Sequence, residues 1–168
     1  MTVLFAHPYD LSASGFYFET LDAYRAKAEA LRNDHGDPVE EFEIQFIDGE
    51  ALDAAVVGAM GIGQGDIGAA LDRLGAWDDQ QKLAVVIAVG ECGYSVSWES
   101  CDPDGFDVEI YADQSLRDLA EAFVDEGLFG EVPEPLLSYL DYDAIARDLA
   151  MDYAEIEIAG TRYVYRCA

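Results

Sequence analysis

An excess of negative charge constrains this chain more than any other feature of its sequence. Its 168 residues include 35 aspartates and glutamates but only 9 lysines and arginines, so the formal net charge is −26. Hydrophobic residues nevertheless make up 51% of the chain and aromatic residues 12%. This composition is too apolar for a disordered acidic tail, and a chain of this length can bury a core. We therefore expect a folded and very acidic protein.

The same charge and the distribution of apolar residues disfavour several classes of protein. No apolar run approaches the roughly 20 residues that a membrane-spanning helix needs. The first twenty residues lack the basic segment of a signal peptide, so we expect a cytoplasmic protein without a membrane partner. Direct binding to DNA or RNA is disfavoured, because the phosphates would meet a field of their own sign.

The N-terminal third alternates between strand and helix patterns. Residues 2–7 and 15–21 are aromatic-rich and read as strands, and residues 22–33 have helical spacing. In residues 41–46, acidic and apolar residues alternate, which predicts a strand with Glu41, Glu43 and Gln45 on its wet face. A small antiparallel sheet with one helix is expected over residues 1–49.

The middle third is rich in Ala, Gly and Val, and its patterns are mainly helical. Helices are expected over residues 51–60, 66–77 and 80–89, although the apolar run within the last range fits a buried strand equally well. The change of composition near residue 50 predicts a boundary, so residues 50–103 form a second, mainly helical domain in this interpretation.

The last third, residues 104–168, predicts a second sheet with helices. Residues 106–111 alternate as a strand with Asp107 and Glu109 facing outward. Residues 115–126 form the clearest helix, with Ser115 as its N-cap and Gly127 after its end. A second helical region runs from Pro133 to about residue 150, and its expected inward positions are Leu136, Leu140, Ile145 and Leu149. A hairpin around Gly160 completes an α+β chain.

Motifs for chemistry are weak or absent in this sequence. Gly63, Gly65 and Gly68 match GxGxxG, but no strand precedes them, so a helix–helix turn explains them better than a nucleotide site. Asp102 and Asp104 lack EF-hand spacing, and the three cysteines form no CxxC pair for zinc. The two histidines belong to no catalytic motif. We expect neither an enzyme nor a bound cofactor or metal.

The acidic residues themselves are the candidate functional feature. Asp118, Glu121 and Asp125 recur on one side of the predicted helix, and such like-charge rows reduce stability. Duplex DNA carries one charge per about 1.7 Å, so 26 charges equal about 44 Å of duplex, or roughly 13 base pairs. A compact chain of this length is roughly 40 Å across. Its charge density therefore suits the DNA-binding groove of another protein.

One segment of the chain resembles a known family. Residues 127–150 contain the pattern G-x-x-G-E-V-P, then L-x-x-Y-x-D-Y, then A-R-D-L. This segment resembles the antirestriction region of the ArdA-type antirestriction proteins of plasmids and conjugative transposons. The early GFYF and EEFEI segments, the length and the acidity are similar to that family as well.

The resemblance implies a structure and a function. It implies an elongated molecule of three small domains in series, which forms a homodimer through its C-terminal part. It also implies that the protein mimics bent duplex DNA and inhibits type I restriction–modification enzymes. The protein would occupy the DNA-binding groove in the specificity and methyltransferase core of such an enzyme, and it would thereby protect a mobile genetic element. The candidate phosphate mimics are Glu40, Glu41, Glu43, Asp107, Glu109, Asp118, Glu121, Asp125, Glu126, Glu131, Glu134, Asp141, Asp143 and Asp148.

Other interpretations of the charge remain open at this point. The acids could serve solubility in a salt-adapted protein, or they could bind another basic DNA-binding protein such as a nucleoid protein. An unrecognised hydrolase is a third alternative. A salt-adapted protein should lose structure at low salt, where a DNA mimic should stay folded and bind most tightly.

Overall fold

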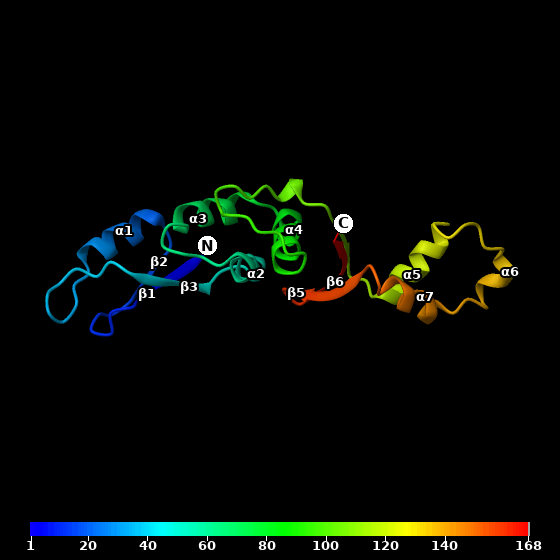
Figure 1. Cartoon of the computed structure of the whole chain (residues 1–168), viewed down its shortest axis with the longest axis horizontal. Coiled ribbons are helices and arrows are strands. Elements are labelled where there is room, and N and C mark those ends of the chain that lie inside the picture. Colours follow the sequence, from blue (N-terminus) through cyan, green and yellow to red (C-terminus); the bar gives the residue numbers. More distant parts are fainter. Residues whose placement is uncertain (168) are drawn as a thin grey trace. The chain divides into compact units, whose positions relative to one another are not determined.

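The structure, a computed structural model that describes residues 1–167, divides into two compact units. Unit 1 runs from Met1 to Phe106, and unit 2 begins at Asp107. Each contains helices and one three-stranded antiparallel sheet, which confirms the α+β class (Figure 1). The division lies close to the predicted boundary at residues 103 and 104, whereas the boundary between 49 and 50 stays a prediction.

Unit 1 places a small sheet before a helical segment. Its elements are β1 (Val3–Pro8), β2 (Phe16–Phe18), α1 (Leu21–Ala30), β3 (Phe42–Asp48), α2 (Ala51–Met60), α3 (Ile67–Ala76), α4 (Asp79–Gly90) and the 3-10 turn η1 (Pro103–Gly105). The first sheet has the order β2-β1-β3. All three expected helices of the middle region are present, and the ambiguous apolar run belongs to helix α4 rather than to a strand.

The alternation of β1 sets the inner face of this sheet. Leu4 and Ala6 are fully buried, and Leu4 pairs with Phe18 on one side and with Phe46 on the other. Strand β2 is shorter than expected, because the chain enters helix α1 at Leu21. Gly15 is required just before β2, since an added Cβ atom would lie 2.5 Å from the Ala6 carbonyl oxygen of the paired strand.

The sheet shares its core with the helical segment of unit 1. Phe18, Tyr24 and Phe42 form an aromatic cluster, and the fully buried Ile67 of α3 belongs to the same core. Gln64, in the glycine-rich turn before α3, donates to the Tyr24 hydroxyl and accepts from the Phe42 amide. The regions predicted as first and second domains are therefore joined by common packing within unit 1.

Unit 2 has the expected strand, helix and hairpin. Its elements are β4 (Val108–Ala112), α5 (Leu116–Asp125), α6 (Glu134–Leu137), α7 (Tyr142–Leu149), β5 (Ala154–Ile158) and β6 (Thr161–Cys167). The sheet order is β4-β6-β5, so the hairpin strand β6 lies at its centre. Ala159 and Gly160 connect β5 to β6, and both have positive φ angles, as a type I′ turn requires.

A small core holds helix α5 against this sheet. Leu119 and Phe123 of α5 pack with Tyr153 and with Val164 of β6. Ser115 caps the helix as expected, and its capping box with Asp118 satisfies amide groups of the first turn. Gly127 has a φ of 73° after the last turn, where its amide bonds to the Val124 carbonyl.

Two expectations for unit 2 were wrong. The region after Pro133 is helical as expected, in a short helix α6 and a separate helix α7, and Leu149 packs against the core of unit 2, but Leu136 is 52% exposed rather than inward. Glu109 does not face freely outward, because its side chain is only 36% exposed and pairs with Arg166 on β6. An apolar pattern shows which side of a helix is hydrophobic, but not whether another element covers it.

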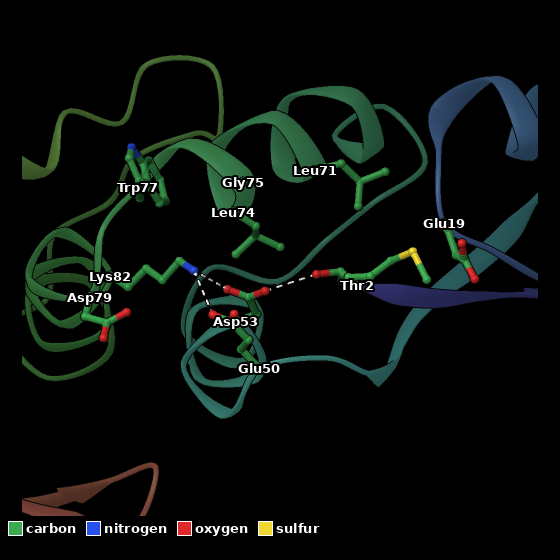
Figure 2. Close-up of a pocket in the computed structure, with 11 residues that line it drawn as sticks. Thr2, Glu19, Glu50, Asp53, Leu71, Leu74, Gly75, Trp77, Asp79 and Lys82 are labelled. Carbon is green, nitrogen blue, oxygen red and sulfur yellow. Dashed lines mark hydrogen bonds and ion pairs between the residues drawn. The ribbon is translucent and has the colours of Figure 1, made fainter.

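A buried ion pair links two helices of unit 1 (Figure 2). Lys82 Nζ of α4 lies 2.6 Å from Asp53 Oδ1 of α2, and the two side chains are only 5% and 7% exposed. Thr2 donates to the other Asp53 oxygen, and Glu50 lies 3.5 Å from the ammonium. Burial lowers the pKa of Lys82, but Asp53 and Glu50 outweigh that effect and raise it above its ordinary value.

Breaking this pair should destabilise unit 1. Asp53→Asn leaves the Lys82 ammonium buried beside Glu50 alone, so we expect a loss of about 3 kcal/mol in the free energy of unfolding. Because the pKa of Lys82 is raised in the folded state, the ion pair contributes fully to the free energy of unfolding below about pH 10.5. This contribution is lost as the pH rises through the pKa of Lys82 in the folded protein. Urea unfolding at pH 7 measures the loss.

The matched control is Asp72→Asn, which removes an exposed acid on α3. It should change the free energy of unfolding by less than about 0.5 kcal/mol. Equal effects of the two substitutions would show that Asp53 and Lys82 do not stabilise the fold as a pair.

Candidate partner-binding surface

The acidic side chains lie almost entirely on the surface. Of the 35 aspartates and glutamates, 30 are exposed. Unit 1 carries 20 acidic and 5 basic residues, and unit 2 carries 15 and 4, so both are strongly negative. Such a surface attracts cationic groups and raises the rate at which a basic partner associates.

The N-terminal candidates lie close together in sequence at the start of β3. Glu40 and Glu41 precede β3, and Glu43 lies within it. All three are exposed, while the intervening Phe42 and the following Ile44 are buried. The predicted wet face of this strand is therefore confirmed, and backbone bonds hold the stretch in place: Tyr9 donates to the Glu41 carbonyl and Gln64 to the Glu40 carbonyl.

The row on helix α5 contains acids with different local roles. Asp118 accepts hydrogen bonds from the amide and the hydroxyl of Ser115, which lowers its pKa. Glu121 lies 3.2 Å from Arg117, and the same arginine reaches Asp143 of α7 at 2.6 Å. Asp125, at the end of the helix, is exposed. Only Asp125 of this row is without a side-chain hydrogen bond or ion pair among the described residues.

The segment between α5 and α7 presents further exposed acids. Glu126, Glu131 and Glu134 follow one another along it, and Asp148 lies on α7. Asp141 differs from these, since its carboxylate caps α7 by accepting from the Ala144 amide at 3.0 Å. Apolar side chains are exposed in the same segment, at Leu128, Phe129, Leu136 and Tyr139.

The two remaining candidates lie at the start of unit 2. Asp107 is exposed just before β4. Glu109, in contrast, accepts hydrogen bonds from the hydroxyls of Tyr111 and Tyr153 and forms an ion pair with Arg166. Burial and then the charge of Glu109 raise the pKa of Tyr111 to about 12. Arg166 also lies 5.4 Å from the centre of the Tyr153 ring, so Glu109 belongs to an internal network.

The described part of the chain offers no grouped metal ligands and no helix that is long and apolar enough to cross a membrane. The residues that the sequence did not single out are those around the buried pair. Glu19, Glu50 and Asp79 surround a cavity beside Asp53 and Lys82 (Figure 2). A lysine directly before the apolar run of α4 was the sequence signal for this cavity.

The comparison with protein families identifies the chain. The family model described as antirestriction protein (ArdA) matches residues 5–164, which is nearly the whole sequence. The chain belongs to this family. The match includes the segment of residues 127–150 on which the resemblance rested. No curated protein matches the sequence closely enough to count as a relative.

Glu109 and Asp107 should differ in their effect on stability. Glu109→Gln removes the ion pair with Arg166, and because both side chains are partly exposed we expect a loss of about 1–2 kcal/mol. Asp107→Asn is the matched control and should change the free energy of unfolding by less than about 0.5 kcal/mol. Thermal unfolding followed by circular dichroism measures both.

A tyrosine titration gives an independent measure of the same substitution. The raised pKa of Tyr111 means that its neutral form stabilises the fold, and this contribution is lost as the pH rises from about 10 to about 12. Glu109→Gln should shift the latest tyrosine transition to lower pH, whereas Asp107→Asn should leave it in place. An unchanged transition in Glu109→Gln would contradict the assigned network.

Proposed function

We propose that the protein inhibits type I restriction–modification enzymes by occupying their DNA-binding groove as a DNA mimic. The observation that carries the proposal is the exposure of 30 carboxylates over a folded scaffold in a member of the ArdA family. Lysine and arginine side chains that bind DNA respond chiefly to the phosphate charges, so fixed carboxylates can compete for them. The protein acts without catalysis, in the cytoplasm, where the enzyme meets incoming DNA of a mobile element.

The candidate acids divide into two groups under this proposal. Those that pair with an arginine or cap a helix position the scaffold, and they are Glu109, Asp118, Glu121, Asp141 and Asp143. The others present charge to the enzyme, and they are Glu40, Glu41, Glu43, Asp107, Asp125, Glu126, Glu131, Glu134 and Asp148. Three of these acids belong to unit 1 and six to unit 2, so both units would contribute charge to the contact.

A homodimer formed through unit 2 completes the proposal. Leu128, Phe129 and Tyr139 are 62%, 56% and 84% exposed in one segment. Apolar side chains exposed together are typical of interfaces, and a second copy of unit 2 would cover them. Two copies would double the charge that faces the enzyme.

Competition with DNA tests the proposal directly. The purified protein is added to a type I restriction enzyme with unmodified DNA, and DNA binding and cleavage are followed from low to high salt. Inhibition should be complete near one dimer per enzyme and should weaken as salt rises. Circular dichroism at each salt concentration shows whether the protein stays folded. Absence of inhibition by folded protein at low salt would overturn the proposal, and unfolding at low salt would favour the salt-adapted alternative.

Charge removal should have a cumulative effect. Single substitutions such as Glu131→Gln should change the half-inhibitory concentration by less than about twofold, because each exposed charge contributes little. Neutralising Asp125, Glu126, Glu131 and Glu134 together should raise it by about tenfold or more. The matched control neutralises four exposed acids of unit 1 outside the proposed set, namely Asp22, Glu29, Asp34 and Asp37.

The control separates the position of the charges from their number. Equal losses in the two quadruple variants would mean that total charge alone governs inhibition. A single substitution that abolished inhibition in folded protein would contradict a distributed contact.

A further inference from the structure

A cavity of about 480 Å³ lies in unit 1 beside the buried ion pair, apart from the surface described above. Helices α2, α3 and α4 supply most of its lining, and Figure 2 shows their side chains pointing toward a common space. Its volume falls within the range of known small-ligand sites. The question is which chemical group suits its charges and its apolar wall.

The charges of the cavity favour a cation. Four carboxylates line it, from Glu19, Glu50, Asp53 and Asp79, against the ammonium of Lys82 and the amino group of Met1. Asp53 contacts Lys82 at 2.6 Å, so these two largely neutralise each other. Glu50 is farther from the ammonium, at 3.5 Å, and its side chain is 68% exposed. Glu19, Glu50 and Asp79 therefore keep a negative potential at the mouth of the cavity.

The opposite wall is apolar. Leu71 and Leu74 of α3 line the cavity, and Trp77 follows at the end of the same helix. A cation with an aliphatic stem can lay that stem on such a wall while its charged end meets the carboxylates. Arginine fits this combination better than lysine, because its planar guanidinium forms paired hydrogen bonds with carboxylates and is more weakly hydrated.

We propose that this cavity receives one arginine side chain of the basic partner protein. The identity of that partner as a restriction enzyme rests on the proposed function, whereas the preference of the cavity for arginine does not. Inserted there, the arginine provides one localised anchor within a contact that is otherwise spread over many surface charges. Buried arginines of this kind commonly dominate the affinity of an interface.

A neutral substitution can block the cavity without changing the charge. Gly75 lies on α3 at the cavity, it is exposed, and a Cβ atom added to it meets nothing within 4 Å. Gly75→Leu should therefore fold, since leucine is also a better helix former than glycine. The matched control is Gly58→Leu on α2, where an added Cβ atom also meets nothing within 4 Å and which does not line the cavity.

The two variants are compared in the salt-dependent competition assay. Gly75→Leu should raise the half-inhibitory concentration by about tenfold, whereas Gly58→Leu should stay within about twofold of the unsubstituted protein. A purely distributed electrostatic contact predicts no difference between them. Equal inhibition by Gly75→Leu and the unsubstituted protein would overturn the proposed anchor and leave the proposed function intact.

A second measurement does not depend on the restriction enzyme. Nα-acetyl-arginine amide is titrated into the isotope-labelled full-length protein, and amide chemical shifts are followed by NMR. Shifts should appear around Gly75 and Lys82, should be smaller with Nα-acetyl-lysine amide, and should disappear in Gly75→Leu but not in Gly58→Leu. If these residues do not respond to the arginine compound, the arginine site is wrong. If they respond while the protein fails to inhibit the enzyme, the site stands and the proposed function fails.

Discussion

Repulsion among exposed carboxylates is the constraint within which this protein must fold. With 30 exposed acids and a net charge of −26, the native state concentrates like charges that the unfolded chain can keep farther apart. Burial of apolar side chains has to offset this repulsion in each unit. Unit 1 does so with an aromatic cluster shared between sheet and helix, whereas unit 2, of roughly 60 residues, has only a small core around Phe123.

The small core of unit 2 gives its local polar contacts more importance. Its few arginines lie where they compensate acids: Arg117 between Glu121 and Asp143, and Arg166 beside Glu109. Other carboxylates accept amide hydrogen bonds at helix starts, where negative charge is favourable. Part of the acidic content thus stabilises the scaffold on which the remaining acids are presented. Counting acids from the sequence alone cannot separate these two groups.

The sequence predicted the elements whose signals are local. Helix α5 was identified from its apolar stripe, its cap at Ser115 and the glycine at 127, and the hairpin was identified from Gly160. The α+β class and the family followed from such segments and from the motif in residues 127–150. These features depend on neighbouring residues, so the sequence contains the relevant information.

The features that the sequence did not predict depend on contacts between distant residues. The alternation of its strand predicts that Glu109 faces outward, yet Arg166 and Tyr153 from other segments contact its carboxylate, together with Tyr111 of the same strand. Asp53 and Lys82 lie in different helices, and nothing in either helix identifies the other as its partner. Leu136 has the spacing of a core residue but no element of the described chain buries it. Which residues pair, and which side chains another element buries, depend on the tertiary structure. The periodicity of apolar residues in the sequence does not specify either.

Ile67 has a further consequence for how the chain can be divided. It is fully buried in the core of the first sheet, although it begins a helix of the region that composition assigns to a different domain. A fragment ending near residue 49 would lack this side chain and the Gln64 contacts to Tyr24 and Phe42, and would expose the aromatic cluster to water. Evolutionary shortening or exchange of modules in this part of the chain is therefore easier at the end of unit 1 than within it.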